Sequence, residues 1–177
     1  MVEGQEGVGW PDWCALAGAA EELGFEGLLR SDHYFSVSGA GERGALDAWG
    51  TVNALAAVTE RIRLGTLVSP VTFRPAAVLA KLALTADHVS GGRIDVGMGT
   101  GWWQAEHEAY GFPFPSIGAR MDELERQLEA VTGFWARTRP APVQRPRPRI
   151  VMGGAATSVK APSMRSRTRQ LVSNGSR

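Results

Sequence analysis

The sequence predicts an α/β fold built on a parallel sheet, because short apolar segments alternate with longer segments of helical periodicity. The candidate strands are nearly continuous apolar runs, which is typical of strands buried on both faces. The connecting segments are of ordinary length, and right-handed crossovers would join the strands. An open doubly wound sheet and a (β/α)8 barrel both satisfy this pattern, although four strands are fewer than a barrel of ~250 residues contains.

The first unit pairs a helix with a short strand. Pro11 suits a first helical position, and apolar residues recur at spacings of three or four as far as Leu23. Gly24 follows as a left-handed cap at the end of the helix. The apolar segment 27–30 is then expected to form a strand that ends at Ser31-Asp32-His33.

The next two units repeat this order. Residues 45–59 carry an apolar stripe that predicts a helix, and residues 62–68 predict a strand that ends at Ser69-Pro70. A third helix begins at Pro75, where a proline is well tolerated. The strand 93–98 follows this helix.

The fourth unit begins after the glycine-rich segment Gly99-Thr100-Gly101. Apolar residues spaced at three and four from Met121 to Trp135 predict a long helix. Residues 149–152 then predict a last strand.

The net charge of +1 conceals a strong asymmetry. Residues 1–134 hold 9 basic residues and all 18 acidic residues, whereas residues 135–177 hold 10 basic residues and no acid. Such a basic segment is compatible with a nucleic-acid arm. It interleaves no aromatic side chains for base stacking among its basic residues after Trp135, and this disfavours nucleic acid as a partner.

Cysteine content and hydropathy bear on the compartment. A single cysteine, Cys14, excludes an intramolecular disulfide and fits a reducing environment. No apolar run approaches the ~18 residues that a membrane span requires, and the first residues lack the basic and apolar regions of a secretory signal. We therefore expect a cytoplasmic protein that does not bind membranes.

Three of the four predicted strands end in residues that could bind a ligand. The carboxyl ends of parallel strands lie on one side of a sheet, so these strand ends should be neighbours in space. They are Asp32-His33, Ser69-Pro70-Val71-Thr72 and Gly99-Thr100-Gly101-Trp102-Trp103. An imidazole beside a carboxylate, a hydroxyl-bearing bend and a glycine loop together indicate a site for a small molecule or a cofactor, although Asp32-His33 could equally form a simple turn.

Other site types are disfavoured. The glycines from Gly97 to Gly101 do not have the spacing of the dinucleotide-binding motif. His107 has no second histidine four residues away and no cysteine nearby, so no metal site is predicted. A nucleophilic serine in a Gly-x-Ser-x-Gly turn is also missing.

Several longer segments resemble the bacterial luciferase-like monooxygenase family over roughly Trp10 to Trp135. The segments that carry the resemblance are Glu21-Glu22-Leu23-Gly24-Phe25 with Ser31-Asp32-His33, Thr59 to Val68, Pro75 to Lys81, Asp87 to Arg93, and Gly97-x-Gly99-x-Gly101-Trp102 with Glu106 and Tyr110-Gly111. The resemblance is strongest to the branch that uses coenzyme F420, a deazaflavin, whereas other relatives use FMN. It implies a (β/α)8 TIM-barrel fold, of which about four of the eight strands are present.

The resemblance also implies roles for single residues. His33 matches the histidine that lies against the cofactor ring and acts as its proton donor or stabilises the reduced ring. The implied cofactor contacts are Asp32, Ser69, Pro70, Thr72, Gly99, Thr100 and Gly101. At the bend formed by Ser69 and Pro70 the family often has a cis peptide, which a proline would make far less costly than the ~3–4 kcal/mol of other residues. The implied reaction is hydride transfer between coenzyme F420, or FMN, and a small organic substrate.

Departures from the family pattern affect the expected substrate and the domain boundaries. Trp102 stands where sugar-phosphate-oxidising members carry a catalytic glutamate, so a sugar phosphate is not the expected substrate. The first nine residues do not have the character of a first barrel strand. We expect residues 1–154 to form a partial barrel and residues 155–177 to be a basic tail, disordered or translated out of frame. A half-barrel would expose strand edges and an apolar interior, so it could be inactive or form a homo-oligomer.

Overall fold

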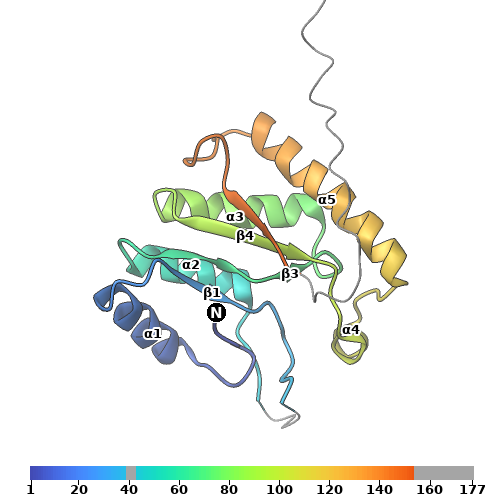
Figure 1. The fold of residues 1–177 in the computed structure, drawn as a ribbon, viewed down its shortest axis with the longest axis horizontal. Helices are drawn as coiled ribbons and strands as arrows, with labels where there is room; N and C mark the ends of the chain where they lie inside the picture. The colour runs from blue at the N-terminus through green and yellow to red at the C-terminus, as the bar shows by residue number, and fades with distance from the viewer. Residues whose placement is uncertain (39–42, 154–177) are drawn as a thin grey trace, which may run out of the picture.

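The computed structural model describes residues 1–38 and 43–153 (Figure 1), and the expected tail lies outside the described residues. Helices and strands alternate as predicted, except that β2 is followed directly by β3 and α4 by α5. In chain order they are α1 (Trp10–Glu22), β1 (Gly27–Arg30), α2 (Ala48–Val58), β2 (Arg63–Thr66), β3 (Ser69–Pro70), α3 (Ala76–Val89), β4 (Ile94–Gly99), α4 (Gln104–Tyr110), α5 (Ile117–Arg137) and β5 (Arg149–Met152). None of the helices in the described ranges has the length and apolar character needed to cross a bilayer.

The five strands form one parallel sheet in which position follows chain order. Met98 of β4 pairs with Ser69 on one edge and with Met152 on the other. Asp95 of β4 likewise pairs with a β2 residue on one side and with β5 on the other. β2 and β3 therefore lie on the same edge of β4 and are two pieces of one interrupted strand, of which β2 lies within the predicted strand 62–68 and β3 lies just beyond it. The sheet runs from β1 through β2 and β3 to β4 and β5, which is the order of a partial TIM-type barrel.

The N-terminal segment extends this sheet by one short contact. Val2 forms a parallel bridge with Arg30 of β1, in which the Val2 amide donates to the Leu29 carbonyl (2.8 Å) and the Ser31 amide donates to the Val2 carbonyl (3.0 Å). Residues 1–9 form no regular strand, as expected, but Val2 makes one parallel pairing beside β1. The backbone around Val2 occupies the position beside β1 that the preceding parallel strand would take.

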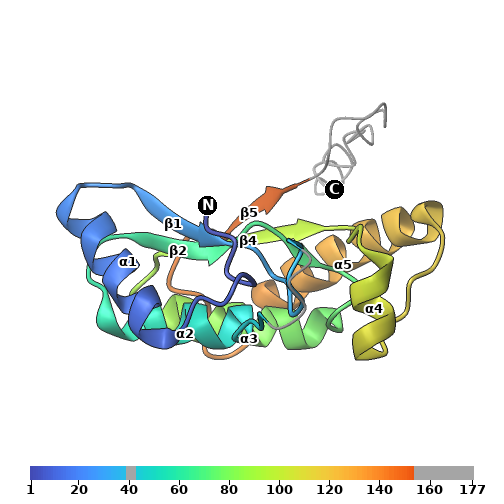
Figure 2. The same cartoon turned by 90° about the horizontal axis from the view of Figure 1, so that it is seen from below.

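The helices α1, α2, α3 and α5 all lie on one face of the sheet (Figure 2). Their apolar stripes meet alternate side chains of the strands, such as Ile94, Val96 and Met98 of β4, in one core. Two fully buried tryptophans, Trp13 and Trp49, are the largest members of this core. The burial of these apolar faces is the main stabilising interaction of the fold.

Local signals fix several helix ends. Gly24 adopts a φ of +74° after α1, as predicted for its cap. Asp47 caps α2 by accepting a hydrogen bond from the Gly50 amide (2.7 Å), so this helix begins three residues after the predicted Ala45. Ser116 caps α5, which begins four residues before the predicted Met121. The short helix α4 was not predicted.

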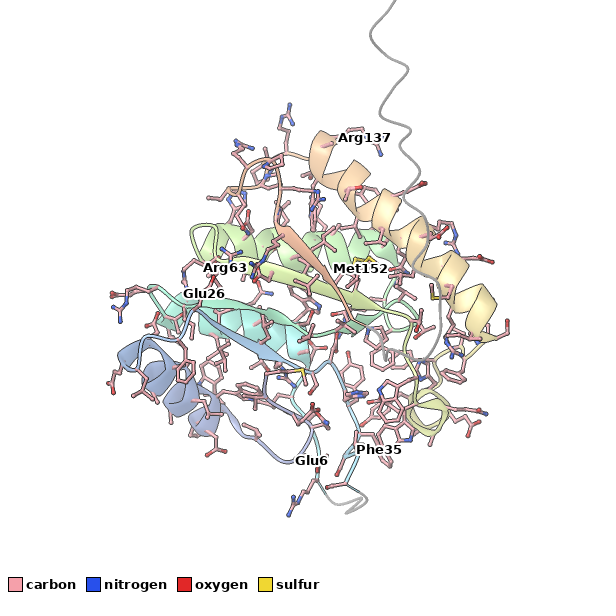
Figure 3. All side chains as sticks on the ribbon, in the orientation of Figure 1. Glu6, Glu26, Phe35, Arg63, Arg137 and Met152 are labelled. Carbon is pink, nitrogen blue, oxygen red and sulfur yellow. The ribbon has the colours of Figure 1, made fainter. Side chains whose placement is uncertain are left out.

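The second face of the sheet carries glycines and a charged cluster. Because Ile94, Val96 and Met98 point toward the helices, Asp95, Gly97 and Gly99 point to the opposite face. There the buried Asp95 carboxylate forms ion pairs with Arg63 of β2 and Arg149 of β5. Arg63 and Arg149 are the first residues of β2 and β5, so this cluster lies at the amino ends of the strands. Figure 3 labels Arg63 at this end of the sheet and Met152 at the opposite end of β5. The expected apolar interior is therefore only partly apolar.

Close contact between β2 and β4 depends on glycine. A Cβ atom at Gly65 would overlap the carbonyl oxygen of Asp95, and a Cβ at Gly97 would overlap the carbonyl oxygen of Thr66. Two strands with ordinary side chains at these positions would have to move apart. The two glycines thus allow β4 to lie close to β2, so that the carboxyl end of β4 reaches the ends of β2 and β3.

The substitution Gly65→Ala should destabilise the protein by about 3 kcal/mol, because the added methyl group collides with backbone rather than with a flexible side chain. Gly18 of α1 provides a matched control, since a Cβ there meets no atom within 4 Å. Gly18→Ala should raise stability by about 0.5–1 kcal/mol through helix propensity. Urea denaturation followed by circular dichroism measures both, and equal stabilities of the two variants would contradict the close contact.

Candidate functional site

A cavity of about 880 Å³ lies at the carboxyl ends of the strands, beside the N-terminal segment. Its volume is in the upper part of the range of about 300–1,000 Å³ that is common for ligand sites. The lining residues are Met1, Glu3, Gln5, Glu6, Ser31, His33, Val37, Ser38, Leu67, Val68, Pro70, Gly99, Thr100, Gly101, Trp102 and Gly153. The predicted convergence of three strand ends on one site is therefore observed.

His33 is held in this cavity by a buried carboxylate. Its Nδ1 lies 2.7 Å from Oε2 of Glu106, which is fully buried on α4. The other carboxylate oxygen accepts hydrogen bonds from the backbone amides of Tyr34 (2.6 Å) and Phe35 (3.1 Å). Glu106 thus connects α4 to the segment that follows β1 and orients the imidazole.

This contact determines which nitrogen of His33 carries a proton. A carboxylate only accepts hydrogen bonds, so Nδ1 donates to Glu106 and bears a hydrogen. Within the described ranges, Nε2 has no hydrogen-bond partner and remains for a ligand. Burial disfavours the charged imidazolium, but the hydrogen bond and negative charge of Glu106 outweigh burial and raise the pKa of His33 above its ordinary value of 6.5.

Asp32 lies beneath the cavity rather than on its wall. Arg74 donates to both of its carboxylate oxygens (2.6 and 3.1 Å), and the Ser69 hydroxyl donates to one of them (2.7 Å). The Ser69 hydroxyl in turn accepts from the indole of Trp49 (2.9 Å). Asp32 and Ser69, both predicted to touch a cofactor, are fully buried and are absent from the lining. In the structure they fix the ends of β1 and β3.

Thr72 also supports the wall from behind. Its hydroxyl oxygen lies 2.7 Å from Nε2 of the buried His107, and Nδ1 of His107 lies 2.7 Å from the Trp103 carbonyl. The carbonyl requires a hydrogen on Nδ1, so in a neutral His107 the Thr72 hydroxyl is the donor to Nε2. Gly101 packs against this pair, because a Cβ there would lie 3.3 Å from both side chains.

The interrupted strand supplies the apolar part of the lining. Leu67 and Val68 lie between β2 and β3 and are joined by a cis peptide bond. Within the described residues the bond between Ser69 and Pro70 is not among the cis bonds. The expectation of a cis bond there is therefore wrong, and the cis bond lies two residues earlier.

An aromatic wall borders the imidazole. The ring of His33 meets the indole of Trp102 edge-on at 5.8 Å and that of Trp103 at 6.2 Å. The two indoles stack on each other at 5.8 Å with an angle of 14°. Trp102 lines the cavity and is exposed, so its indole is not part of the core.

The N-terminal segment adds two carboxylates that the sequence did not indicate. Glu6 accepts hydrogen bonds from the hydroxyls of Ser38 and Ser36 and from the amides of Ser38 and Val37. These bonds, those of the Ser38 and Ser36 hydroxyls first, lower the pKa of Glu6 to about 2. Figure 3 shows Glu6 near Phe35, where the two segments meet. Glu3, the second carboxylate, also lines the cavity.

The described part of the cavity fits a flat ring better than it fits a charged tail. Leu67, Val68 and Pro70 provide apolar surface, and the glycines allow close approach of backbone to a ring. The lining includes Glu3 and Glu6 but, among the described residues, no lysine or arginine that could bind a phosphate. In TIM barrels phosphate groups are frequently bound by loops after the seventh and eighth strands, which lie outside this partial sheet.

The structure thus separates the predicted residues into two groups. His33, Pro70, Gly99, Thr100 and Gly101 line the cavity. Asp32, Ser69 and Thr72 support it through hydrogen bonds, and their contact with a cofactor remains a prediction. Glu106 was noted in the sequence only as part of a family pattern, and its buried contact with His33 depends on the unpredicted helix α4.

Replacing Glu106 with Gln should lower the pKa of His33, because burial still disfavours the imidazolium while the charge of Glu106, the main group that opposes burial, is lost. The stability that wild type gains from protonating His33 is complete below pH 6.5 and is lost as the pH rises through the raised pKa. NMR titration of the imidazole resonances, assigned with His33→Gln, measures the shift. Glu108→Gln, an exposed carboxylate on the same helix, is the control and should leave the pKa of His33 unchanged.

Comparison with known proteins gives a family match over most of the chain. The sequence profile of the luciferase-like monooxygenases matches residues 2–161. An FMNH2-dependent dimethylsulfone monooxygenase of Pseudomonas putida is 29% identical over 82% of this chain and 44% of its own length. A Mycobacterium tuberculosis protein, provisionally named a coenzyme F420-dependent oxidoreductase, is 33% identical over 81% of this chain and 38% of its own length. The chain thus spans less than half the length of these curated relatives.

Solved structures show the same architecture. The monooxygenase RslO1 from Streptomyces bottropensis superposes with a TM-score of 0.69 at 29% identity, over 87% of this chain and 53% of that one. The coenzyme F420-dependent tetrahydromethanopterin reductase from Methanopyrus kandleri gives a TM-score of 0.65 at 22% identity, over 84% and 48% of the two chains. At that identity the second comparison supports the fold alone. The family match and the partial parallel barrel together show that this chain belongs to the luciferase-like monooxygenase family.

Proposed function

We propose that this chain forms the ring-binding part of an oxidoreductase that uses coenzyme F420, or alternatively FMN, to transfer hydride to or from a small organic substrate. The observation that carries the proposal is the position of His33 on the cavity wall, with Nδ1 held by Glu106 and Nε2 without a described partner. Relatives that are named for each of the two cofactors support the choice of chemistry.

Each part of the site has a chemical task. Bound in the cavity, a flavin or deazaflavin would accept or donate the hydride. The apolar side chains of Leu67, Val68 and Pro70 would pack against its ring, and the backbone at Gly99 and Gly101 would approach its edge. These contacts would orient the ring and exclude water from it.

His33 would control the charge next to the ring. With Nδ1–H fixed by Glu106, Nε2 is the atom that gains or releases a proton. The raised pKa favours the imidazolium more than in an ordinary histidine, and this cation would stabilise the extra electron density of a reduced ring. When the bound ring is oxidised again and loses this electron density, Nε2 would exchange its proton with the ring or the substrate, as a general acid–base group does.

Titration of the 177-residue protein with coenzyme F420 and with FMN, followed by fluorescence, tests the binding part of the proposal. One of the two should bind saturably. Failure of both to bind would contradict the proposal and favour the alternative of an inactive barrel fragment. Raising the salt concentration should have little effect on a ring held by apolar contacts, whereas binding to phosphates of a nucleic acid would weaken steeply.

The role of His33 is tested separately by the midpoint potential of the bound cofactor. His33→Gln should leave the affinity for the oxidised form nearly unchanged but lower the potential by about 30 mV, the equivalent of ~1.4 kcal/mol for two electrons. His88→Gln is the matched control, because His88 lies in the last turn of α3 and its Nε2 contacts the Ala141 carbonyl outside the cavity. An unchanged potential in the His33 variant would remove His33 from this role.

A further inference from the structure

Trp102 is placed so that one face of its indole can receive a ligand. It lies in the segment between β4 and α4, lines the cavity, and is 62% exposed. Trp103 stacks against one face of the indole, and His33 meets the indole edge-on. Because these two neighbours fix the ring and cover only part of it, a flat apolar surface remains open next to the imidazole.

The charge of the cavity restricts what can lie on this surface. Glu3 and Glu6 line the same cavity, and hydrogen bonds from Ser38, Ser36 and Val37 hold Glu6 in its anionic form. Among the side chains of the described lining residues, only the imidazole of His33 can carry a positive charge. An anionic ligand would therefore meet two carboxylates without a lysine or arginine to offset them.

Aromatic rings recognise one another by geometry and charge. The face of an indole carries negative electrostatic potential, so it binds the face or edge of another aromatic ring and also binds cations. It offers no comparable attraction to a carboxylate or phosphate. The open face of Trp102 and the two carboxylates thus both favour aromatic ligands that carry no negative charge.

We propose that Trp102 is the stacking surface for the substrate, and that the substrate is a planar aromatic molecule without an anionic group. This inference rests on the proposed function, because it places the substrate beside His33 and a cofactor ring on the surface formed by Leu67, Val68 and Pro70. The cavity volume of about 880 Å³ leaves room for a second planar molecule beside a tricyclic ring.

Two probes that share one ring system and differ in charge test the inference, namely neutral 2-naphthamide and anionic 2-naphthoate. Their dissociation constants are measured by isothermal titration calorimetry with the protein alone and with the protein saturated with FMN or coenzyme F420. Naphthamide should bind in both cases, and naphthoate should bind at least about 10-fold more weakly. Equal affinities for the two probes would overturn the inference.

Variants of Trp102 identify the surface that the probe contacts. Trp102→Ala should weaken naphthamide binding about 5- to 10-fold, whereas Trp102→Phe should retain most of it, in keeping with a lost or retained aromatic stack. Trp10→Ala is the control, since Trp10 is partly exposed at the start of α1 and does not line the cavity. Circular dichroism confirms that each variant is folded.

Cofactor binding distinguishes a role of Trp102 in binding the substrate from a role in binding the cofactor ring. Trp102→Ala should change the affinity for the cofactor less than twofold, because the indole is assigned to the substrate. An equal loss of cofactor affinity, or competition between naphthamide and the cofactor, would overturn the inference and make Trp102 part of the ring site. If neither cofactor binds, the proposed function fails, while the dependence of naphthamide binding on Trp102 in the protein alone still decides whether the indole is a stacking surface.

Discussion

The buried carboxylate of Glu106 is the contact on which the site depends. It binds the imidazole of His33 with one oxygen and the amides of Tyr34 and Phe35 with the other, and so joins the segments that follow β1 and β4. A carboxylate without water must be satisfied by such donors, because an unpaired buried charge is very costly. The same three bonds therefore stabilise the loop and set the protonation of the histidine.

The sheet makes this contact possible through its spacing. Gly65 and Gly97 let β2 and β4 approach each other more closely than strands with side chains at these positions could. The strand ends then meet around one cavity, while Asp95 and its two arginines occupy the amino ends of the same strands. The cavity and the Asp95 cluster thus lie at opposite ends of the sheet, whereas the ion pair of Asp32 and Arg74 lies at the same end as the cavity.

Most of the architecture could be predicted from the sequence, because periodicity reports which face of an element is buried. The strands 27–30 and 149–152 and the left-handed cap at Gly24 agree with the structure in full. The interruption after Thr66 and the position of the cis bond could not be predicted, since they depend on contacts between strands rather than on local pattern.

The site was predictable only in outline, for the same reason. Parallel strands bring His33 and Gly101 to one cavity whatever their side chains contact, so their convergence follows from the topology. The burial of Asp32 under Arg74, by contrast, depends on a residue 42 positions away. The contribution of Glu6 also needed coordinates, because the N-terminal segment shows no strand periodicity.

Half of the bonding capacity of Glu106 goes to peptide amides, and this has an evolutionary consequence. Tyr34 and Phe35 donate through their backbone, so the clamp itself sets no requirement on their side chains. Trp102 is largely exposed, and substitutions at such positions usually change stability by no more than about 0.5 kcal/mol. Related sequences can therefore diverge at exposed positions such as Trp102 while the buried contact between Glu106 and His33 stays intact.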